Sequence, residues 1–255
     1  MWFIPSNGSE LLVTGFEPKN SISKIIIIVP PFAEEMNKSR KHCADFSRKI
    51  ASDKDSNCAV YQLDLFGCGD SEGDFSGASW SLWKDNIAQL VQVLMLEQPQ
   101  AQVCLLGVRL GAALALDVVL TNQTTKIHQL ICWQPVLNGR QFINQFFRIK
   151  IAATMNDKLP VTMTTLRQEL EQNQCVEVGG YEVTAALAAD IESLELHKIS
   201  MFTTVIAIGW FEVSSADCPK LLPVSEKILS QWQAGVNCYS RAVNGDKFWQ
   251  SVETV

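Results

Sequence analysis

Residues 105–112 constrain the fold of this chain more than any other stretch, and they read Leu-Leu-Gly-Val-Arg-Leu-Gly-Ala. They predict a buried strand that ends in a sharp turn and passes directly into a helix, because Gly107 and Gly111 let strand and helix approach closely. Arg109 stands at the centre of this turn. The central residue of such a turn usually adopts a positive φ, which costs a residue with a side chain about 1–2 kcal/mol. We therefore expect a function or an ion pair to retain Arg109 at this position.

Strand and helix patterns alternate along most of the chain. Asn7-Gly8 is a hairpin turn signal, so residues 1–17 are expected to form two short antiparallel strands at a sheet edge. Apolar runs predict further strands at 25–29, 59–64, 127–133, 202–211 and 237–243. Helical patterns are found at about 37–50, 80–96, 110–120 and 224–234, and from about 246. This order predicts an α/β protein with a mostly parallel, doubly wound sheet and helices on both faces.

The pattern changes between residues 137 and 198. Strand signals are absent there, and the sequence predicts three helices, near residues 142–149, 163–172 and 183–194, with an interruption near Gly179-Gly180. We expect residues 137–198 to form a helical cap insertion over the ends of the strands. Residues 1–136 and 199–255 would then form the core.

The carboxyl ends of the parallel strands are expected to carry the functional site, because ligands bind there in open α/β sheets. Four segments fall at these ends, namely the loop after Pro30, the loop after Asp64, the turn at Arg109 and the loop after Gln134.

Four stretches of the chain together resemble one family. They are residues 30–40 (PPFAEEMNKSR), 64–75 (DLFGCGDSEGDF), 107–117 (GVRLGAALALD) and 133–148 (WQPVLNGRQFINQFFR). With these motifs the chain resembles the exosortase A system-associated hydrolases of the second type. The resemblance implies an α/β-hydrolase fold and a cytoplasmic bacterial protein. It also implies a setting in exopolysaccharide production and protein sorting, with a protein partner from that system.

The catalytic residues usual in a serine hydrolase of this fold are incomplete here. Arg109 stands in the place of the nucleophile, and a guanidinium stays protonated and cannot attack a carbonyl. The catalytic base of this fold follows the last strand, but the corresponding stretch, 243–249, contains no histidine. The three histidines of the chain lie elsewhere, at His42, His128 and His197.

Three carboxylates are candidates for chemistry beside Arg109. Glu212 follows a predicted strand and could pair with the arginine. Glu34 and Glu35 lie in the loop after the first buried strand, where adjacent side chains of an extended chain point in opposite directions. We therefore expect one of them to enter the cleft. There it could activate water for hydrolysis, or it could simply neutralise Arg109.

Further residues at the strand ends are candidates for ligand binding, and they are Phe32, Asn37, Lys38, Arg40, Asp64 and Gln134. Asn37 is also a candidate N-cap of the first long helix. Ser71 lies in a literal Gly-x-Ser-x-Gly sequence, but its glycine-rich loop predicts a structural role. Ser39 is expected near the start of a helix, where capping or contact with an anion would suit it.

Composition excludes several classes of function. A net charge of −6 argues against nucleic-acid binding, although a local arginine could still hold a small anionic or acyl-type ligand. The eight cysteines are widely spaced, which favours reduced core residues over disulfides. No apolar run reaches the roughly 20 residues of a membrane span, and no basic region marks a signal peptide. We expect no metal and no cofactor.

Three functions are compatible with these residues. The first is an unconventional hydrolase or acyl-transfer enzyme, in which Arg109 binds substrate and Glu34 or Glu35 acts as base. The second is a non-catalytic binding protein that uses Arg109 to hold an anionic ligand. The third is a structural accessory that offers its surface to a protein partner.

Overall fold

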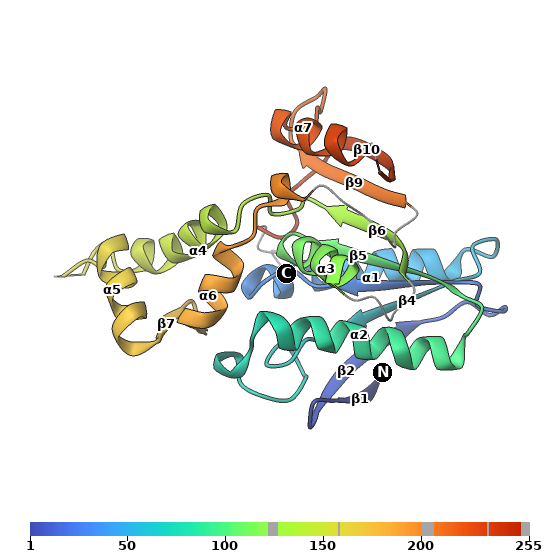
Figure 1. The fold of residues 1–255 in the computed structure, drawn as a ribbon, viewed down its shortest axis with the longest axis horizontal. Helices are drawn as coiled ribbons and strands as arrows, with labels where there is room; N and C mark the ends of the chain where they lie inside the picture. The colour runs from blue at the N-terminus through green and yellow to red at the C-terminus, as the bar shows by residue number, and fades with distance from the viewer. Residues whose placement is uncertain (122–126, 158, 200–206, 234, 251–255) are drawn as a thin grey trace.

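The computed structural model describes every residue except 122–126, 158, 200–206, 234 and 251–255. Its main feature is an eight-stranded sheet (Figure 1). The strands lie in the order β1 (Trp2–Ser6), β2 (Ser9–Phe16), β4 (Cys58–Leu63), β3 (Lys24–Val29), β5 (Gln102–Val108), β6 (Ile127–Trp133), β9 (Ala207–Ser214) and β10 (Asn237–Asn244). Only the β1–β2 and β2–β4 pairs of this sheet are antiparallel.

Side chains alternate between the two faces of the sheet and form two separate cores. Ile25 and Ile27 of β3 pack in the larger core with α2 and α3, whereas Ile28 packs in the smaller core with Cys43 of α1. The helices of this layered part are α1 (Glu34–Ser52), α2 (Trp80–Glu97), α3 (Leu110–Thr121) and α7 (Pro223–Trp232), with a short 3-10 helix, η1 (Phe75–Gly77). Because β3 is buried on both faces, its β-branched run has no polar alternation.

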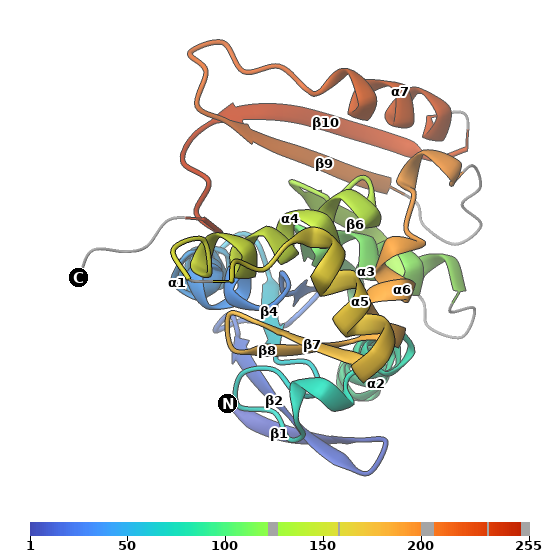
Figure 2. The same cartoon turned by 90° about the vertical axis from the view of Figure 1, so that its left-hand side faces the viewer.

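Elements between Gly139 and Lys198 form a segment that we call the cap, and it projects beyond the strand ends (Figures 1 and 2). It consists of α4 (Gly139–Ala153), α5 (Met163–Asn173), β7 (Cys175–Val178), β8 (Tyr181–Thr184), α6 (Ala185–Glu192) and the 3-10 helix η2 (Leu196–Lys198). The expectation of a cap without strands is wrong. β7 and β8 pair as an antiparallel hairpin whose turn is Gly179-Gly180, at φ values of 60° and 86°. The two glycines turn the chain where a helix interruption was expected.

The predicted hairpin at Asn7-Gly8 and the buried strands and helices before the cap are confirmed, with one exception at α1. This helix begins at Glu34, so Asn37 lies inside it and the N-cap prediction is wrong. Ala33 occupies the N-cap position at a φ of 52°, without a side-chain cap. The predicted start of α1 was late because no Ser, Thr, Asp or Asn precedes Glu34.

The chain after the cap follows the prediction for α7 and β10 and differs from it at β9 and at the end of the chain. Of the strand predicted at 202–211, residues 202–206 lie outside the described residues, and β9 continues past the predicted end to Ser214. The chain after β10 makes a turn at 248–250 where a helix was predicted, and 251–255 lie outside the described residues. Within the described part of the chain, no helix combines the length and apolar character needed to cross a bilayer.

Candidate functional site

The turn between β5 and α3 holds Arg109 at a φ of 57°, the left-handed value expected for the centre of such a turn. Glycines on either side are required by close packing. A Cβ on Gly107 would lie 2.3 Å from Cα of Ala112, and a Cβ on Gly111 would lie 2.3 Å from the backbone oxygen of Pro30. The two glycines therefore let α3 start directly behind the strand, and they present the Arg109 side chain at the carboxyl end of the sheet.

Three neighbours hold the Arg109 side chain. Its Nε lies 3.3 Å from both carboxylate oxygens of Glu35, and its Nη2 donates to Oε1 of Glu35 at 3.2 Å. Its Nη1 donates to the backbone oxygen of Gln134 at 3.4 Å. The guanidinium carbon lies 5.3 Å from the ring centroid of Trp249, which is a cation–π distance. The Arg109 and Glu35 side chains are only 14% and 22% exposed, so they form a partly buried ion pair.

Glu35 reaches Arg109 because it belongs to the first turn of α1. Glu34 and Glu35 are helical rather than extended, so the expectation based on extended geometry is wrong. Successive side chains on a helix diverge by about 100°, which directs Glu35 to Arg109 and Glu34 to the pocket rim. Both acids also gain from the partial positive charge at the helix N-terminus.

The Glu35 carboxyl has an altered affinity for its proton. Burial raises its pKa above the ordinary value of 4.5. The Arg109 guanidinium counteracts this rise through its charge and its hydrogen bonds, and Lys38 adds a smaller effect in the same direction. Arg109 therefore favours the ionised form of this carboxyl against the effect of burial.

A pocket of about 400 Å³ lies between the cap and the strand ends. That volume falls in the range of roughly 300–1,000 Å³ common for small-molecule sites. The ring of Phe32 forms its apolar floor, with centroids 5.7 Å from Phe142 and 5.1 Å from Phe146 of α4. The pocket is lined by Phe32, Glu34, Glu35, Lys38, Arg109, Phe142, Gln145, Phe146, Ile149, Val178, Gly179, Tyr181, Trp249 and Gln250.

A hydrogen-bonded group connects α1 to the cap hairpin at the rim of this pocket. Nδ2 of Asn37 donates to Oε2 of Glu34 at 2.9 Å and to the hydroxyl oxygen of Tyr181 at 3.0 Å. The Tyr181 hydroxyl in turn donates to Glu34 at 3.4 Å. Asn37, expected to bind ligand, therefore positions Glu34 and the cap. Tyr181 was not predicted, and its place in an alternating segment after Gly179-Gly180 was the signal that could have indicated a strand.

Charges on the pocket lining are balanced. Lys38 and Arg109 supply two cations, and Glu34 and Glu35 supply two carboxylates. Because Glu35 already neutralises Arg109, the lining has no surplus of positive charge for a polyanion. The balance suits a mainly apolar molecule with a single polar end.

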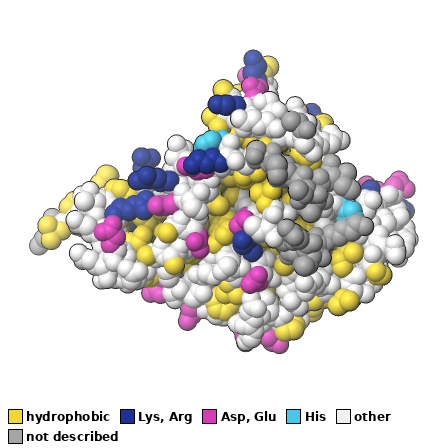
Figure 3. All heavy atoms as spheres, in the orientation of Figure 1, with side chains coloured by type: hydrophobic (Ala, Val, Ile, Leu, Met, Phe, Trp, Pro, Cys, Tyr) yellow, Lys and Arg dark blue, Asp and Glu magenta, His cyan; other side chains and the backbone are white. Residues whose placement is uncertain are grey.

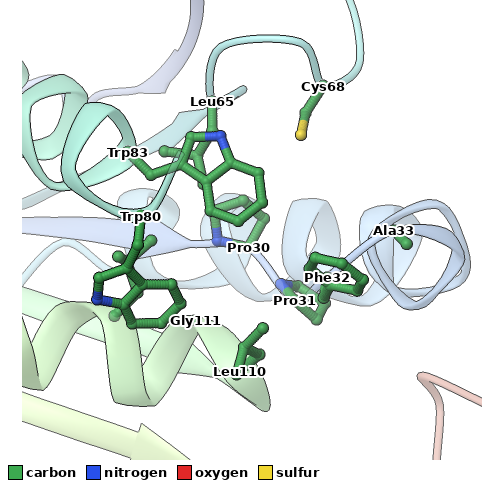
Figure 4. Close-up of a pocket in the computed structure, with 11 residues that line it drawn as sticks. Pro30, Pro31, Phe32, Ala33, Leu65, Cys68, Trp80, Trp83, Leu110 and Gly111 are labelled. Atoms are coloured by element: carbon green, nitrogen blue, oxygen red, sulfur yellow. The ribbon is translucent and has the colours of Figure 1, made fainter. Parts of the chain in front are cut away.

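A second and much smaller cavity lies beside the same turn (Figure 4). Its volume is about 10 Å³, which is room for at most one water molecule. Its walls are apolar and include Pro30, Trp80, Trp83 and Leu110, together with Cys68. Burial raises the pKa of the Cys68 thiol to about 12, so this thiol stays protonated and is a poor nucleophile.

Arg40 and Asp64, both expected to bind ligand, instead form a structural pair outside the pocket. Nη2 of Arg40 lies 3.0 Å from Oδ2 of Asp64. A Cβ on Gly69, at a φ of 60°, would lie 2.1 Å from the same oxygen, so the loop must carry glycine to wrap this pair. Ser71 donates to the backbone oxygen of Asp64 at 2.5 Å and accepts from the backbone nitrogen of Leu12 at 2.8 Å. Its hydroxyl is fully used in fixing the loop to β2.

Glu212 does not meet Arg109, and the expected pairing of the two is wrong. One carboxylate oxygen of Glu212 accepts from Nε1 of Trp210 at 3.0 Å, and the other accepts from the backbone nitrogen of Leu222 at 2.8 Å. Residues two apart on a strand share a face, so Trp210 and Glu212 lie side by side on β9, and the carboxylate bonds to the indole rather than to Arg109. The buried carboxylate fixes the connection between β9 and α7.

Gln134 was expected to bind ligand through its side chain, but that side chain joins two strands. Its Oε1 accepts from the backbone nitrogen of Val213 at 2.6 Å, and its own backbone nitrogen donates to Phe211 at 2.7 Å. Only the backbone oxygen of Gln134 faces Arg109. The residue therefore positions the arginine.

A conventional nucleophile and base are absent from the described pocket lining, which contains no Ser, Thr, Cys or His. Ser39 is fully buried in α1 and donates to the backbone oxygen of Glu35 at 2.7 Å, so contact with an anion is excluded. The ring of His42 stacks on Phe248 at 4.9 Å, and Nδ1 of His128 accepts from Val103 at 3.1 Å. All eight cysteines are free, and no metal-binding cluster of His, Cys, Asp or Glu occurs in the described residues.

The sheet order, the turn after β5 and the pocket at the strand ends define an α/β-hydrolase fold, and solved structures agree. Est1E from Butyrivibrio proteoclasticus, with ferulic acid bound, is 15% identical, has a TM-score of 0.63, and the match covers 96% of this chain and 90% of that chain. The alpha/beta hydrolase GrgF from Penicillium sp. sh18 is 15% identical with a TM-score of 0.60, and the match covers 96% and 89%. Proline iminopeptidase from Mycobacterium smegmatis is 10% identical with a TM-score of 0.56, and the match covers 97% and 91%.

Residues 21–187 match the family described as "Serine aminopeptidase, S33", and this is more than half of the chain. The chain belongs to this family of α/β-hydrolases. No curated protein matches it by sequence. The predicted α/β-hydrolase fold is thus confirmed.

Proposed function

We propose that this chain is a ligand-binding member of its hydrolase family, which binds a small acyl-type or aromatic acid and does not hydrolyse the esters of such acids. One observation carries the proposal. The nucleophile position holds Arg109, whose guanidinium is paired with Glu35 of α1 and covered by Trp249 of the segment that would supply the base. In place of a nucleophile for acyl transfer, the site holds a guanidinium that is fixed by Glu35, Gln134 and Trp249.

The chemistry of the pocket supports a ligand with an apolar body and one oxygen-bearing end. Rings of Phe32, Phe142 and Phe146 offer the apolar surface. A guanidinium has five N–H donors, and the described contacts of Arg109 use one on Nε, one on Nη1 and one on Nη2. The remaining N–H on each terminal nitrogen suits a carboxylate, which accepts two parallel hydrogen bonds from such a fork.

Calorimetric titration with ferulic acid and with short fatty acids tests this proposal. Ferulic acid is a suitable probe because it combines an aromatic ring with a carboxyl, and it is bound in the solved structure of Est1E. We expect saturable binding, weakened at least tenfold in Arg109→Met, since a charge-assisted hydrogen-bonded pair contributes about 1.5–3 kcal/mol. Arg40→Met is the matched control, because Arg40 pairs with Asp64 outside the pocket. Absence of binding, or equal losses in both variants, would contradict the proposal and favour a structural accessory.

Hydrolysis without a serine is the second candidate, and one observation favours it. Glu35 is a partly buried carboxyl with a raised pKa, which is a property of general bases that activate water. Its oxygens, however, already accept from Arg109, so the pair would have to open before water could be activated. Loss of ester turnover in Glu35→Gln, with binding retained, would support this candidate over the first.

We also propose a setting beside exopolysaccharide production and protein sorting, with a protein partner from that system. Support for this setting comes from the motifs at 30–40, 64–75, 107–117 and 133–148 alone. Deletion of the gene in its bacterial host tests it. We expect less exopolysaccharide or mislocalised sorted proteins, restored by the wild-type gene. Unchanged levels of both would contradict the proposed setting.

A further inference from the structure

Lys38 of α1 brings a cation without an acidic partner to the pocket. Its side chain is partly buried and lines the pocket. In the described part of the chain, this side chain forms neither an ion pair nor a hydrogen bond. Figure 3 shows several Lys and Arg side chains beside Asp or Glu on one face of the molecule. The ion pairs of Lys84 with Asp117 and of Lys150 with Glu169 are of that kind. Lys38 instead has its charge available to a molecule in the pocket.

Glu34 is the acid that helix geometry would place beside Lys38. Residues four apart lie on the same side of a helix, and a glutamate four positions before a lysine commonly pairs with it. Here Oε2 of Glu34 accepts instead from Nδ2 of Asn37 at 2.9 Å and from the Tyr181 hydroxyl at 3.4 Å. We call Glu34, Asn37 and Tyr181 the rim group. The rim group occupies the Glu34 carboxylate and so leaves Lys38 unpaired.

Glu35, three residues before Lys38 on α1, is already bound to Arg109. Both of its carboxylate oxygens lie 3.3 Å from Nε of Arg109. The charge of Lys38 still reaches this carboxyl, since it helps to lower the pKa of Glu35. Lys38 therefore lies close to the Arg109–Glu35 pair. An anion at the free N–H groups of Arg109 would lie within the electrostatic reach of Lys38 as well.

We propose that Lys38 is the counter-ion of the ligand and selects ionised acids over neutral molecules of the same shape. The ligand carboxylate would accept from the free N–H groups of Arg109 and from the ammonium group of Lys38. Arg109 offers hydrogen bonds but little net charge, because Glu35 neutralises it. Lys38 supplies the charge that distinguishes a carboxylate from an amide or an ester. This inference rests on the ligand binding proposed above, and it names the ligand class as monoanionic acids.

Calorimetric titration with ferulic acid and with its neutral amide tests the role of Lys38. At about pH 7 the acid is ionised, so the two probes differ mainly in charge. We expect the wild type to bind the acid about tenfold more tightly, because charge-assisted hydrogen bonds are stronger than neutral ones. In Lys38→Met the affinity for the acid should fall about tenfold, with that for the amide unchanged. Lys38→Arg keeps the charge and should keep most of the preference.

Lys49→Met is the matched control, because Lys49 is exposed on the same helix about three turns further on. It should bind both probes like the wild type. Equal wild-type affinities for acid and amide would overturn the inference, and so would equal losses of both probes in Lys38→Met, which would indicate a structural role. Failure of the wild type to bind either probe would refute the proposed ligand binding itself, and this inference with it.

Two further variants test the rim group. Asn37→Ala combined with Tyr181→Phe removes both donors to Glu34, whose carboxylate is then free to pair with Lys38. We expect the preference for the acid to fall about twofold to threefold, the effect of a partly exposed ion pair that competes for the lysine. Adding Glu34→Gln should restore the preference, because no carboxylate remains to compete. An unchanged preference in the double variant, or no recovery with Glu34→Gln, would overturn the role of the rim group.

Discussion

Removal of the Arg109–Glu35 ion pair should destabilise the folded chain by a predictable amount. Breaking a fully buried pair from one side costs about 3–5 kcal/mol, because the remaining charge is left without a partner. Arg109 and Glu35 keep 14% and 22% of their side-chain exposure, so solvent compensates part of that cost. We therefore expect Glu35→Ala to lower the free energy of unfolding by about 2–3 kcal/mol. For a chain of this size, that corresponds to a fall in melting temperature of roughly 4–12 °C.

A double-mutant cycle measured by urea unfolding isolates the pair from the loss of each side chain alone. Glu35→Ala, Arg109→Ala and the double variant should give a coupling free energy of about 1–3 kcal/mol. The control is Arg48→Ala, because the Arg48–Asp45 pair is 63% and 60% exposed and should contribute at most about 0.5 kcal/mol. A coupling below about 0.5 kcal/mol for Arg109 and Glu35 would refute the reasoning, since the pair would then behave as if it were on the surface.

Three further predictions follow from the same site. Arg109→Gly should be about 1 kcal/mol more stable than Arg109→Ala in urea unfolding, because only glycine accepts a φ of 57° without cost. Gly111→Ala should destabilise by about 2 kcal/mol or more in the same assay, because its Cβ would meet the backbone oxygen of Pro30 at 2.3 Å. Carboxyl NMR titration should place the pKa of Glu35 above 4.5 and higher still in Arg109→Met. The folded chain holds the Glu35 proton to a higher pH than the unfolded chain does. The contribution of Glu35 to the free energy of unfolding should therefore fall as pH rises from 4.5 through the pKa of the folded chain.

The turn at Arg109 could be predicted from sequence because its determinants are local. Glycines at 107 and 111 and an apolar run before them leave few backbone solutions, and the structure has a positive φ at Arg109. The buried strand β3 was equally clear, since its unbroken β-branched run suits a strand with both faces covered.

The sequence limited the candidates for the ion-pair partner of Arg109 to three acidic residues, but it did not show which of them forms the pair. Glu35 is separated from Arg109 by 74 residues, and its direction depends on α1 starting at Glu34. No capping side chain marks the start of α1 in the sequence, and Asn37 was a misleading candidate for the N-cap. Glu212 bonds instead to Trp210, two residues away on the same strand. Composition and spacing do not reveal this hydrogen bond.

Residues of the cap that complete the pocket were the hardest to predict. Tyr181 meets Glu34 across 147 residues, and its position depends on a hairpin inside a segment expected to be helical. The hairpin had a local signal, because Gly179-Gly180 separates two short alternating segments. The distance between Tyr181 and α1, by contrast, is set by packing of the whole cap and has no counterpart in local sequence.

Ester turnover tests the central claim, binding without hydrolysis, most directly. A panel of aryl esters and thioesters of short acids should be assayed at micromolar protein, with wild type, Arg109→Ala and Glu35→Gln in parallel. The account predicts that none of the three exceeds the uncatalysed rate, while wild type binds the corresponding free acids. Turnover by the wild type that disappears in both variants would contradict the account and place Arg109 and Glu35 in a hydrolytic mechanism.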